Sequence, residues 1–198
     1  MKFFNLLVLT LCFCACASGH RIENVKLVNT QKDKPVFMND GQKRTVLKMS
    51  FDINKKNYNF LLLATKKENY INFKIFGDFA SVISSVNLRG GNFDYEIIPP
   101  FSTDEITQAL EEILLTLFEK NADLIKQSEK VAVYKQGALK QKYYFNEGDN
   151  LPYKLKQTSP LANKTFLFEN YKDGVPQNIT VKAKFNLIEI NFDLLAHD

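Results

Sequence analysis

Apolar and polar residues alternate along most of this chain. In the segment LKMSFDIN the apolar side chains occupy the odd positions from Leu47 to Ile53, and the segments YINFKIF and LIEINFDLL repeat the pattern. A period of two indicates antiparallel strands with one buried and one solvated face. Turn-forming clusters such as RGGN and KDGVPQN separate the alternating segments. This arrangement favours strands that pair with their neighbours along the chain.

The alternation predicts about eleven strands. The last predicted segment is long enough for two strands. Its apolar positions are odd through Phe185 and even from Ile188, so a turn or bulge is expected near Asn186 and Leu187. The predicted strands lie near 22–28, 44–54, 58–66, 69–77, 79–87, 92–98, 131–136, 139–146, 151–158, 165–171 and 178–195.

One segment has a helical period instead. The residues TDEITQALEEILLTLF follow two prolines, and Ser102 and Glu105 have the spacing of a capping box. We predict a helix from about 103 to 119, and an extension to 127 is left open. Glu111, Glu112 and Glu119 are expected on its other, polar face. The apolar stripe that would pack on the sheet consists of Ile106, Leu110, Ile113, Leu114 and Leu117.

These elements predict a mainly β protein with one or two helices. A twisted sheet of about eleven strands tends to curl. The economical arrangement is a strongly curved antiparallel sheet, an incomplete barrel, closed by the mid-chain helix on its concave side. Such a curve can hold an apolar ligand between sheet and helix, although each inward side chain also fits an ordinary core. The candidates for lining that space are Phe73, Ile75, Phe76, Phe79, Ile113, Leu117, Phe185, Ile190 and Phe192.

The first residues have the pattern of an export signal. Residues 3–15 are almost continuously apolar, but they are too few for a helix that spans a bilayer, which needs roughly 20 residues. The letters FCAC place a small residue before Cys16, as in a bacterial lipobox. We therefore expect residues 1–16 to be a signal peptide ending at the lipidated Cys16, and residues 17–198 to form a single lipid-binding-type β domain. Ordinary secretory cleavage before Ser18 is the alternative.

Composition narrows the classes of function. The net charge of +4 is spread along the chain without a clustered basic patch, which argues against nucleic acid as a partner. The only histidines are His20 and His197, and no cysteine follows Cys16. Catalysis by Ser–His or Cys–His pairs and metal sites built from His or Cys are therefore not expected in the folded region. We predict a binding protein rather than an enzyme, with no catalytic residue, metal or cofactor. The 17 phenylalanines favour an apolar ligand.

Three stretches carry a resemblance to a known family: FKIFGDFASVISSVNLRGGNFDYEIIPP, TDEITQALEEILLTLF and FENYKDGVPQNITVKAKFNLIEINFDLL. With the lipoprotein-type leader, they resemble the LolA/LolB-like carriers. More narrowly, they are similar to an uncharacterised bacterial lipoprotein family found near aryl polyene biosynthesis genes. The resemblance implies an outer-membrane lipoprotein, anchored through Cys16 and facing the periplasm. Such a protein would bind or transfer a lipid or acylated molecule, and periplasmic carriers or envelope-assembly proteins would be its partners.

Two other interpretations remain open. The chain fits a structural or assembly lipoprotein of the cell envelope, with a fully packed core and no ligand. It also fits a soluble periplasmic or secreted lipid-binding protein, which in a eukaryote would carry glycans at the sequons of Asn163 or Asn178.

Overall fold

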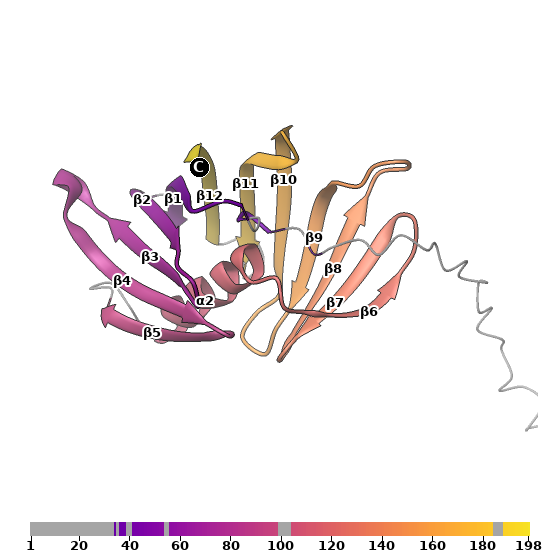
Figure 1. Ribbon diagram of the computed structural model, residues 1–198, viewed down its shortest axis with the longest axis horizontal. Helices are drawn as coiled ribbons and strands as arrows, with labels where there is room; N and C mark the ends of the chain where they lie inside the picture. Colours follow the sequence, from indigo (N-terminus) through magenta and orange to yellow (C-terminus); the bar gives the residue numbers. More distant parts are fainter. Residues whose placement is uncertain (1–33, 35, 39–40, 54–55, 99–103, 184–187) are drawn as a thin grey trace, which may run out of the picture.

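A computed structural model describes residues 34, 36–38, 41–53, 56–98, 104–183 and 188–198 (Figure 1). Within these residues, twelve strands form one antiparallel sheet. The strands are β1 (Arg44–Ile53), β2 (Lys56–Lys66), β3 (Ile71–Phe76), β4 (Val82–Arg89), β5 (Asn92–Ile97), β6 (Asp123–Gln127), β7 (Val131–Gln136), β8 (Leu139–Phe145), β9 (Pro152–Thr158), β10 (Lys164–Lys172), β11 (Val175–Ala183) and β12 (Ile188–His197).

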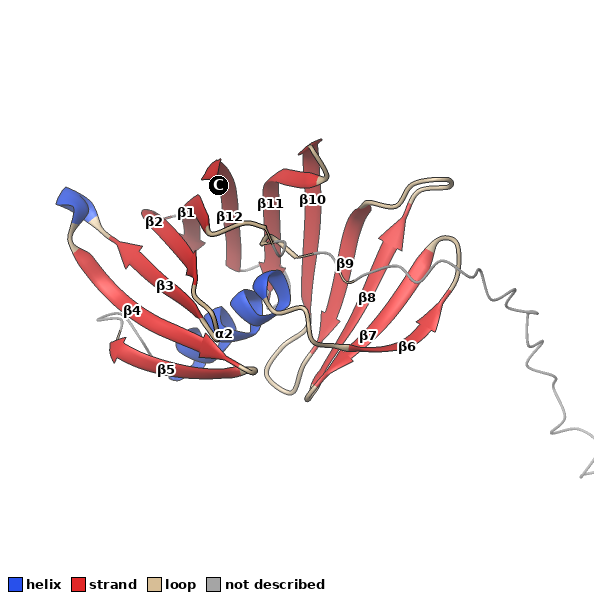
Figure 2. Ribbon diagram, viewed as in Figure 1, coloured by secondary structure: helices blue, strands red, loops and turns tan. Residues whose placement is uncertain are grey.

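The order of the strands explains the shape of the sheet. It runs β5-β4-β3-β2-β1-β12-β11-β10-β9-β8-β7-β6, so β1 pairs with the last strand, while β5 and β6 are the two edges. The helix α2 (Asp104–Phe118) follows one edge strand and precedes the other. The sheet curves around it like an open bowl, and α2 crosses the concave side (Figures 1 and 2). The predicted fold, a curved and unclosed antiparallel sheet with a mid-chain helix, is confirmed.

The strand predictions agree with the structure in most places. The long segment predicted at 178–195 forms two strands, β11 and β12. These strands pair with each other, and Ala183 lies opposite Ile188 at one end of the pairing. The connecting residues 184–187, the predicted strand at 22–28 and the capping serine at 102 lie outside the described residues. The strand expected to start at 79 starts at Val82, because residues 78–80 form a short 3-10 turn.

The extension of the helix to residue 127 is wrong, because residues 123–127 form the edge strand β6. The helix ends where a distant segment satisfies its last carbonyl groups. The backbone N–H of Phe37 donates to the oxygen of Leu117 at 2.8 Å, and the Lys34 ammonium donates to the oxygen of Glu119 at 2.6 Å. Such partners at a helix C-terminus remove the need for another turn.

The inward faces of the strands and the apolar stripe of α2 form one core. The odd positions Leu47, Met49 and Phe51 of β1 are buried, as the alternation predicts. At the C-terminal end of α2, the ring of Phe118 stacks on Phe37 with centroids 5.8 Å apart and meets the edge of Phe73 at 5.0 Å. On the helix, the buried residues are Leu110, Ile113, Leu114, Thr116, Leu117 and Phe118.

Candidate functional site

An apolar cavity of about 320 Å³ lies between the N-terminal half of α2 and the middle of the sheet. Pockets of roughly 300–1,000 Å³ with mainly apolar walls are typical of small-molecule sites. The helix contributes four of its inward residues, and strands β1, β11 and β12 contribute the opposite wall. The apolar lining includes Ile106, Ala109, Leu110 and Ile113 from the helix and Phe51, Ala183, Ile188 and Ile190 from the sheet.

A charged group also lines this cavity. Lys164 begins β10, its side chain is almost completely buried, and its ammonium pairs with the carboxylate of Glu112 on α2. A buried charge is tolerated only when it is paired or hydrogen-bonded. The pair therefore ties the helix to the sheet and places a polar group at the wall of a mainly apolar space.

The pair is one end of a buried chain of polar side chains. Gln157 Nε2 donates to Glu112 Oε2 at 3.3 Å, and Thr116 Oγ1 donates to Gln157 Oε1 at 2.9 Å. Gln141 Nε2 then donates to Thr116 Oγ1 at 3.2 Å and to Gln136 Oε1 at 3.1 Å. We call Lys164, Glu112, Gln157, Thr116, Gln141, Gln136 and Lys34 the polar network.

Lys34 is the other end of the polar network. Its ammonium donates to the carbonyl oxygens of Leu115 and Glu119, at 3.4 Å and 2.6 Å, and to Gln136 Oε1 at 3.0 Å. Burial lowers the pKa of Lys34 to about 7, because the interior disfavours a positive charge, and the Glu119 carboxylate partly offsets this shift. The residue links the segment before β1 to the end of α2 and to β7.

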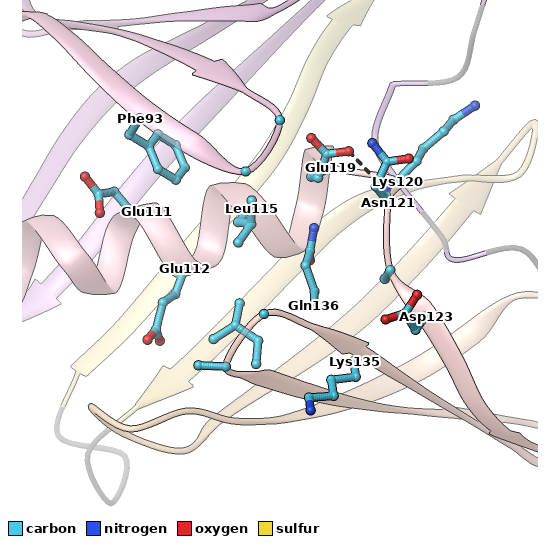
Figure 3. Close-up of a pocket in the computed structure, with 16 residues that line it drawn as sticks. Phe93, Glu111, Glu112, Leu115, Glu119, Lys120, Asn121, Asp123, Lys135 and Gln136 are labelled. Carbon is cyan, nitrogen blue, oxygen red and sulfur yellow. Dashed lines mark hydrogen bonds between the residues drawn. The ribbon is translucent and has the colours of Figure 1, made fainter.

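A second hollow, of about 840 Å³, lies beside the C-terminal half of α2 (Figure 3). We call it the polar groove. The turn at Gly90 and Gly91 and the turn at Gly137 and Ala138 approach it from opposite halves of the sheet. Its charged and polar lining consists of Glu111, Glu112, Glu119, Lys120, Asn121, Asp123, Lys135 and Gln136, and its apolar lining includes Phe93, Leu115, Ala122 and Leu139.

Glu111 and Glu112 do not lie on a solvated face, which is where the sequence analysis had placed them. Glu111 and Glu112 are half-buried. Burial raises the pKa of Glu111, and a hydrogen bond with Tyr95 of β5 lowers it again in part. Burial, and after it the neighbouring Glu111 carboxylate, raise the pKa of the Tyr95 hydroxyl, so that it remains a donor. Both carboxylates therefore hold the helix against the sheet.

The predicted cavity residues separate into four groups. Ile113 and Ile190 line the apolar cavity. Phe73, Ile75, Leu117 and Phe192 are buried in the packed core, and Phe76 is half-buried. Phe79 stands at the tip of the β3–β4 connection with its ring fully exposed, so it lines no interior space. Phe185, like Cys16, lies outside the described residues.

Sequence reasoning missed the polar network, although a signal for it exists. Gln141 of β8 has the same parity as the buried Leu139, Tyr143 and Phe145. Because side chains along a strand alternate between its two faces, Gln141 points inward as well. Gln157 of β9 and Lys164 of β10 likewise share the parity of buried neighbours. An isolated glutamine or lysine at an inward position must find partners across the core.

The described residues contain no group of three or more His, Cys, Asp or Glu side chains that could hold a metal ion. In the same part of the chain, no helix has the length and apolar character needed to cross a membrane.

Among solved structures, the chain is similar to a LolA superfamily protein from Nitrosomonas europaea, with a TM-score of 0.54, 10% sequence identity and coverage of 84% of this chain and 90% of that chain. It is also similar to a proposed outer membrane lipoprotein-sorting protein domain from Vibrio parahaemolyticus, with a TM-score of 0.53, 14% identity and coverage of 80% and 85%. The fold is LolA-like. At these identities the likeness concerns the LolA-like fold and not the activity. No family model and no curated protein match the chain.

Proposed function

We propose that this protein is an envelope lipoprotein that binds or transfers a lipid or acylated molecule in its apolar cavity. The observation that carries the proposal is the cavity of about 320 Å³ between α2 and strands β1, β11 and β12. It lies against the buried core residues Leu110, Ile113 and Ile190, and most of its lining is apolar. When an acyl chain covers such a surface, burial of apolar area stabilises the complex by about 25 cal/mol for each Å² removed from water.

The LolA-like fold supports the same proposal, because one structure with this fold is a proposed outer membrane lipoprotein-sorting protein domain. In the proposal, Cys16 carries the lipid anchor and the folded domain faces the periplasm from the outer membrane. The narrower likeness to lipoproteins found near aryl polyene biosynthesis genes stays a prediction.

Uptake of diphenylhexatriene tests the cavity, because this neutral rod fluoresces only in apolar surroundings. We expect the folded protein to bind it and Ala109→Phe to lose at least tenfold in affinity, since the new ring fills the cavity from the helix side. The matched control is Gln108→Phe, which adds the same ring at an exposed position of the same helix. Equal uptake by both variants, with both folded by circular dichroism, would reject the cavity as the site.

The alternative function is that of a structural or assembly lipoprotein without a ligand. The dense packing of Phe37, Phe73 and Phe118 around the end of α2 favours it. Native mass spectrometry of protein extracted from its own envelope separates the two proposals. Acyl groups on Cys16 together with a bound lipid support the carrier, while acylated protein that binds neither lipid nor diphenylhexatriene supports the structural role. A chain that starts at Ser18 without acyl groups would contradict the anchor.

A further inference from the structure

Five lysines lie together on the outer face of strands β7, β8 and β9. Side chains alternate along each strand, and the lysines occupy outward positions beside buried inward residues. Along the sequence these charges are interspersed with other residues. The pairing of the three neighbouring strands gathers them into a basic patch that the composition did not predict. We call this surface the lysine face, and it consists of Lys135, Lys140, Lys142, Lys154 and Lys156.

The pairing of these strands sets like charges against each other. Lys142 of β8 is directly opposite Lys156 of β9, and Lys135 of β7 is directly opposite Lys140 of β8. Like charges at opposite positions of two paired strands destabilise a sheet. Among the pairings of the described strands, one acid lies opposite a residue of the lysine face, which is Asp123 of β6 opposite Lys135.

Elsewhere in the same sheet, lysines lie opposite acids. Lys182 of β11 is opposite Glu189 of β12 and forms an ion pair with it at 3.4 Å. Lys48 of β1 is opposite Asp193 of β12. No ion pair joins the lysine face to another described residue. The lysine face therefore carries a repulsion that other pairings of the sheet avoid, as expected of a surface that binds an anionic partner.

The side chains of the lysine face favour a broad anionic surface over a single phosphate group. All five cations are lysines, which are hydrated point charges without the planar fork by which arginine grips one phosphate or carboxylate. Tyr144 lies between them on β8, opposite Lys154, and the Lys142 ammonium is 5.0 Å from the centre of its ring. An amphipathic ring among lysines suits the boundary between lipid head groups and water.

The shape of the lysine face also favours a membrane. The face is on the convex side of the sheet, away from α2 (Figure 1). Of the two hollows described above, the apolar cavity includes none of the five lysines and the polar groove includes only Lys135. A convex face has no walls to hold an extended peptide, whereas clusters of roughly four to eight basic residues bind anionic lipid head groups.

We propose that the lysine face binds the surface of an anionic membrane. The ammonium groups attract the phosphate groups of the lipid heads, and the ring of Tyr144 lies at the level of those heads. The concave side of the sheet, with α2, then faces away from the membrane. This inference goes beyond the proposed function, because it involves neither the apolar cavity nor an anchor at Cys16.

Sedimentation with vesicles tests the proposal. The full chain carries Cys16→Ser, so that no acyl group can anchor it. One set of vesicles is phosphatidylcholine alone, and the other is an equal mixture of phosphatidylcholine and phosphatidylglycerol. At low salt we expect roughly tenfold or tighter binding to the anionic vesicles, and at about 0.5 M salt we expect that difference to disappear. Equal binding to both kinds of vesicle at low salt would overturn the proposal.

A triple variant locates the binding on the lysine face. It combines Lys142→Gln, Lys154→Gln and Lys156→Gln, and it should bind the anionic vesicles at least tenfold more weakly, because each lysine near an anionic surface contributes roughly fivefold in affinity. An acidic protein partner is the other outcome. If the parent chain binds poly-L-glutamate through these lysines but binds neither kind of vesicle, the face belongs to an acidic protein and the membrane proposal is overturned.

A matched control removes the same charge elsewhere. It combines Lys43→Gln, Lys48→Gln and Lys67→Gln, at exposed positions outside the lysine face. Its affinity for the anionic vesicles should fall by about threefold or less, because only the net charge changes. Equal losses in the two triple variants would show that the net charge, and not the lysine face, attracts the membrane.

Lys156→Glu separates the role of the lysine face in binding from its effect on stability. The substitution gives Lys142 an opposite charge across β8 and β9. The variant should unfold at a higher denaturant concentration than the parent chain, and it should bind the anionic vesicles about fivefold or more weakly. A lower midpoint of unfolding, or unchanged binding to the anionic vesicles, would contradict a repulsion that is retained for membrane binding.

Discussion

The two sides of α2 pack against the sheet in different ways. Toward β1, β3, β11 and β12 the helix presents Leu110, Ile113 and Phe118, and the contacts there are apolar. Toward β8, β9 and β10 it presents Glu112 and Thr116, and the contacts there are the ion pair and hydrogen bonds of the polar network.

The difference between the two sides separates the stability of the helix from its position along the sheet. Apolar burial is non-directional and roughly proportional to area, so the apolar side supplies stability but tolerates small shifts. Hydrogen bonds between buried groups need particular distances and angles, so the polar side determines where the helix lies along the sheet. The cavity lies on the apolar side and the groove beside the polar side, with Lys164 and Glu112 at the boundary.

The largest effect is expected on the apolar side. Phe118→Ala removes a buried ring that stacks on Phe37 and meets the edge of Phe73. We expect the free energy of unfolding to fall by about 3–5 kcal/mol, measured by denaturant titration. The same change at the fully exposed ring, Phe79→Ala, should alter it by about 0.5 kcal/mol or less. A similar loss in both variants would mean that the packing around α2 does not supply the stability.

A smaller effect with a different signature is expected on the polar side. Glu112→Leu leaves the Lys164 ammonium buried without its partner, so the free energy of unfolding should fall by about 3 kcal/mol. Adding Lys164→Met should restore part of that loss, because an apolar pair of similar volume replaces a buried ion pair, while Gln157 Nε2 still lacks the Glu112 oxygen that it donated to. A double-mutant cycle in denaturant measures the coupling. Strictly additive losses would show that the two residues do not act as a pair.

The smallest effect concerns the pH dependence of the polar side. The pKa of Lys34 is about 7 in the folded protein and near 10.5 in the unfolded chain, so the unfolded chain binds more protons between these values. Stability should therefore rise as the pH rises from 7 to 9, by about 1 kcal/mol per pH unit. Lys34→Met should remove this part of the slope, whatever its stability at pH 7. Parallel pH profiles of the two proteins would contradict a buried Lys34 with a lowered pKa.

The sequence predicted the apolar side far better than the polar side. The parity of Leu47, Met49 and Phe51 and the stripe of α2 follow from periods of 2 and 3.6, which are local properties of the backbone. In the polar network, parity directs Gln141, Gln157 and Lys164 inward, but no period says which partners they meet. Its members come from α2, four strands and the segment before β1, and each taken alone resembles a surface residue.

The end of the helix shows the same limit. The segment after Phe118 has apolar residues that suit either a helix or a strand, and it forms β6 because it pairs with β7 at the edge of the sheet. The carbonyl groups at the end of the helix accept hydrogen bonds from Lys34 and Phe37. Lys34 is more than eighty residues away from these groups along the chain. No local pattern encodes a partner at that separation.

For this protein, the alternation of side chains alone determined a curved antiparallel sheet with an amphipathic helix inside it, because burying one face of every strand allows few other arrangements. The presence of a cavity, its size and its position were decided by the tertiary structure. They depend on how completely Leu110, Ile113 and Ile190 fill the space between helix and sheet, and close packing is a property of the assembled side chains and not of their order along the chain.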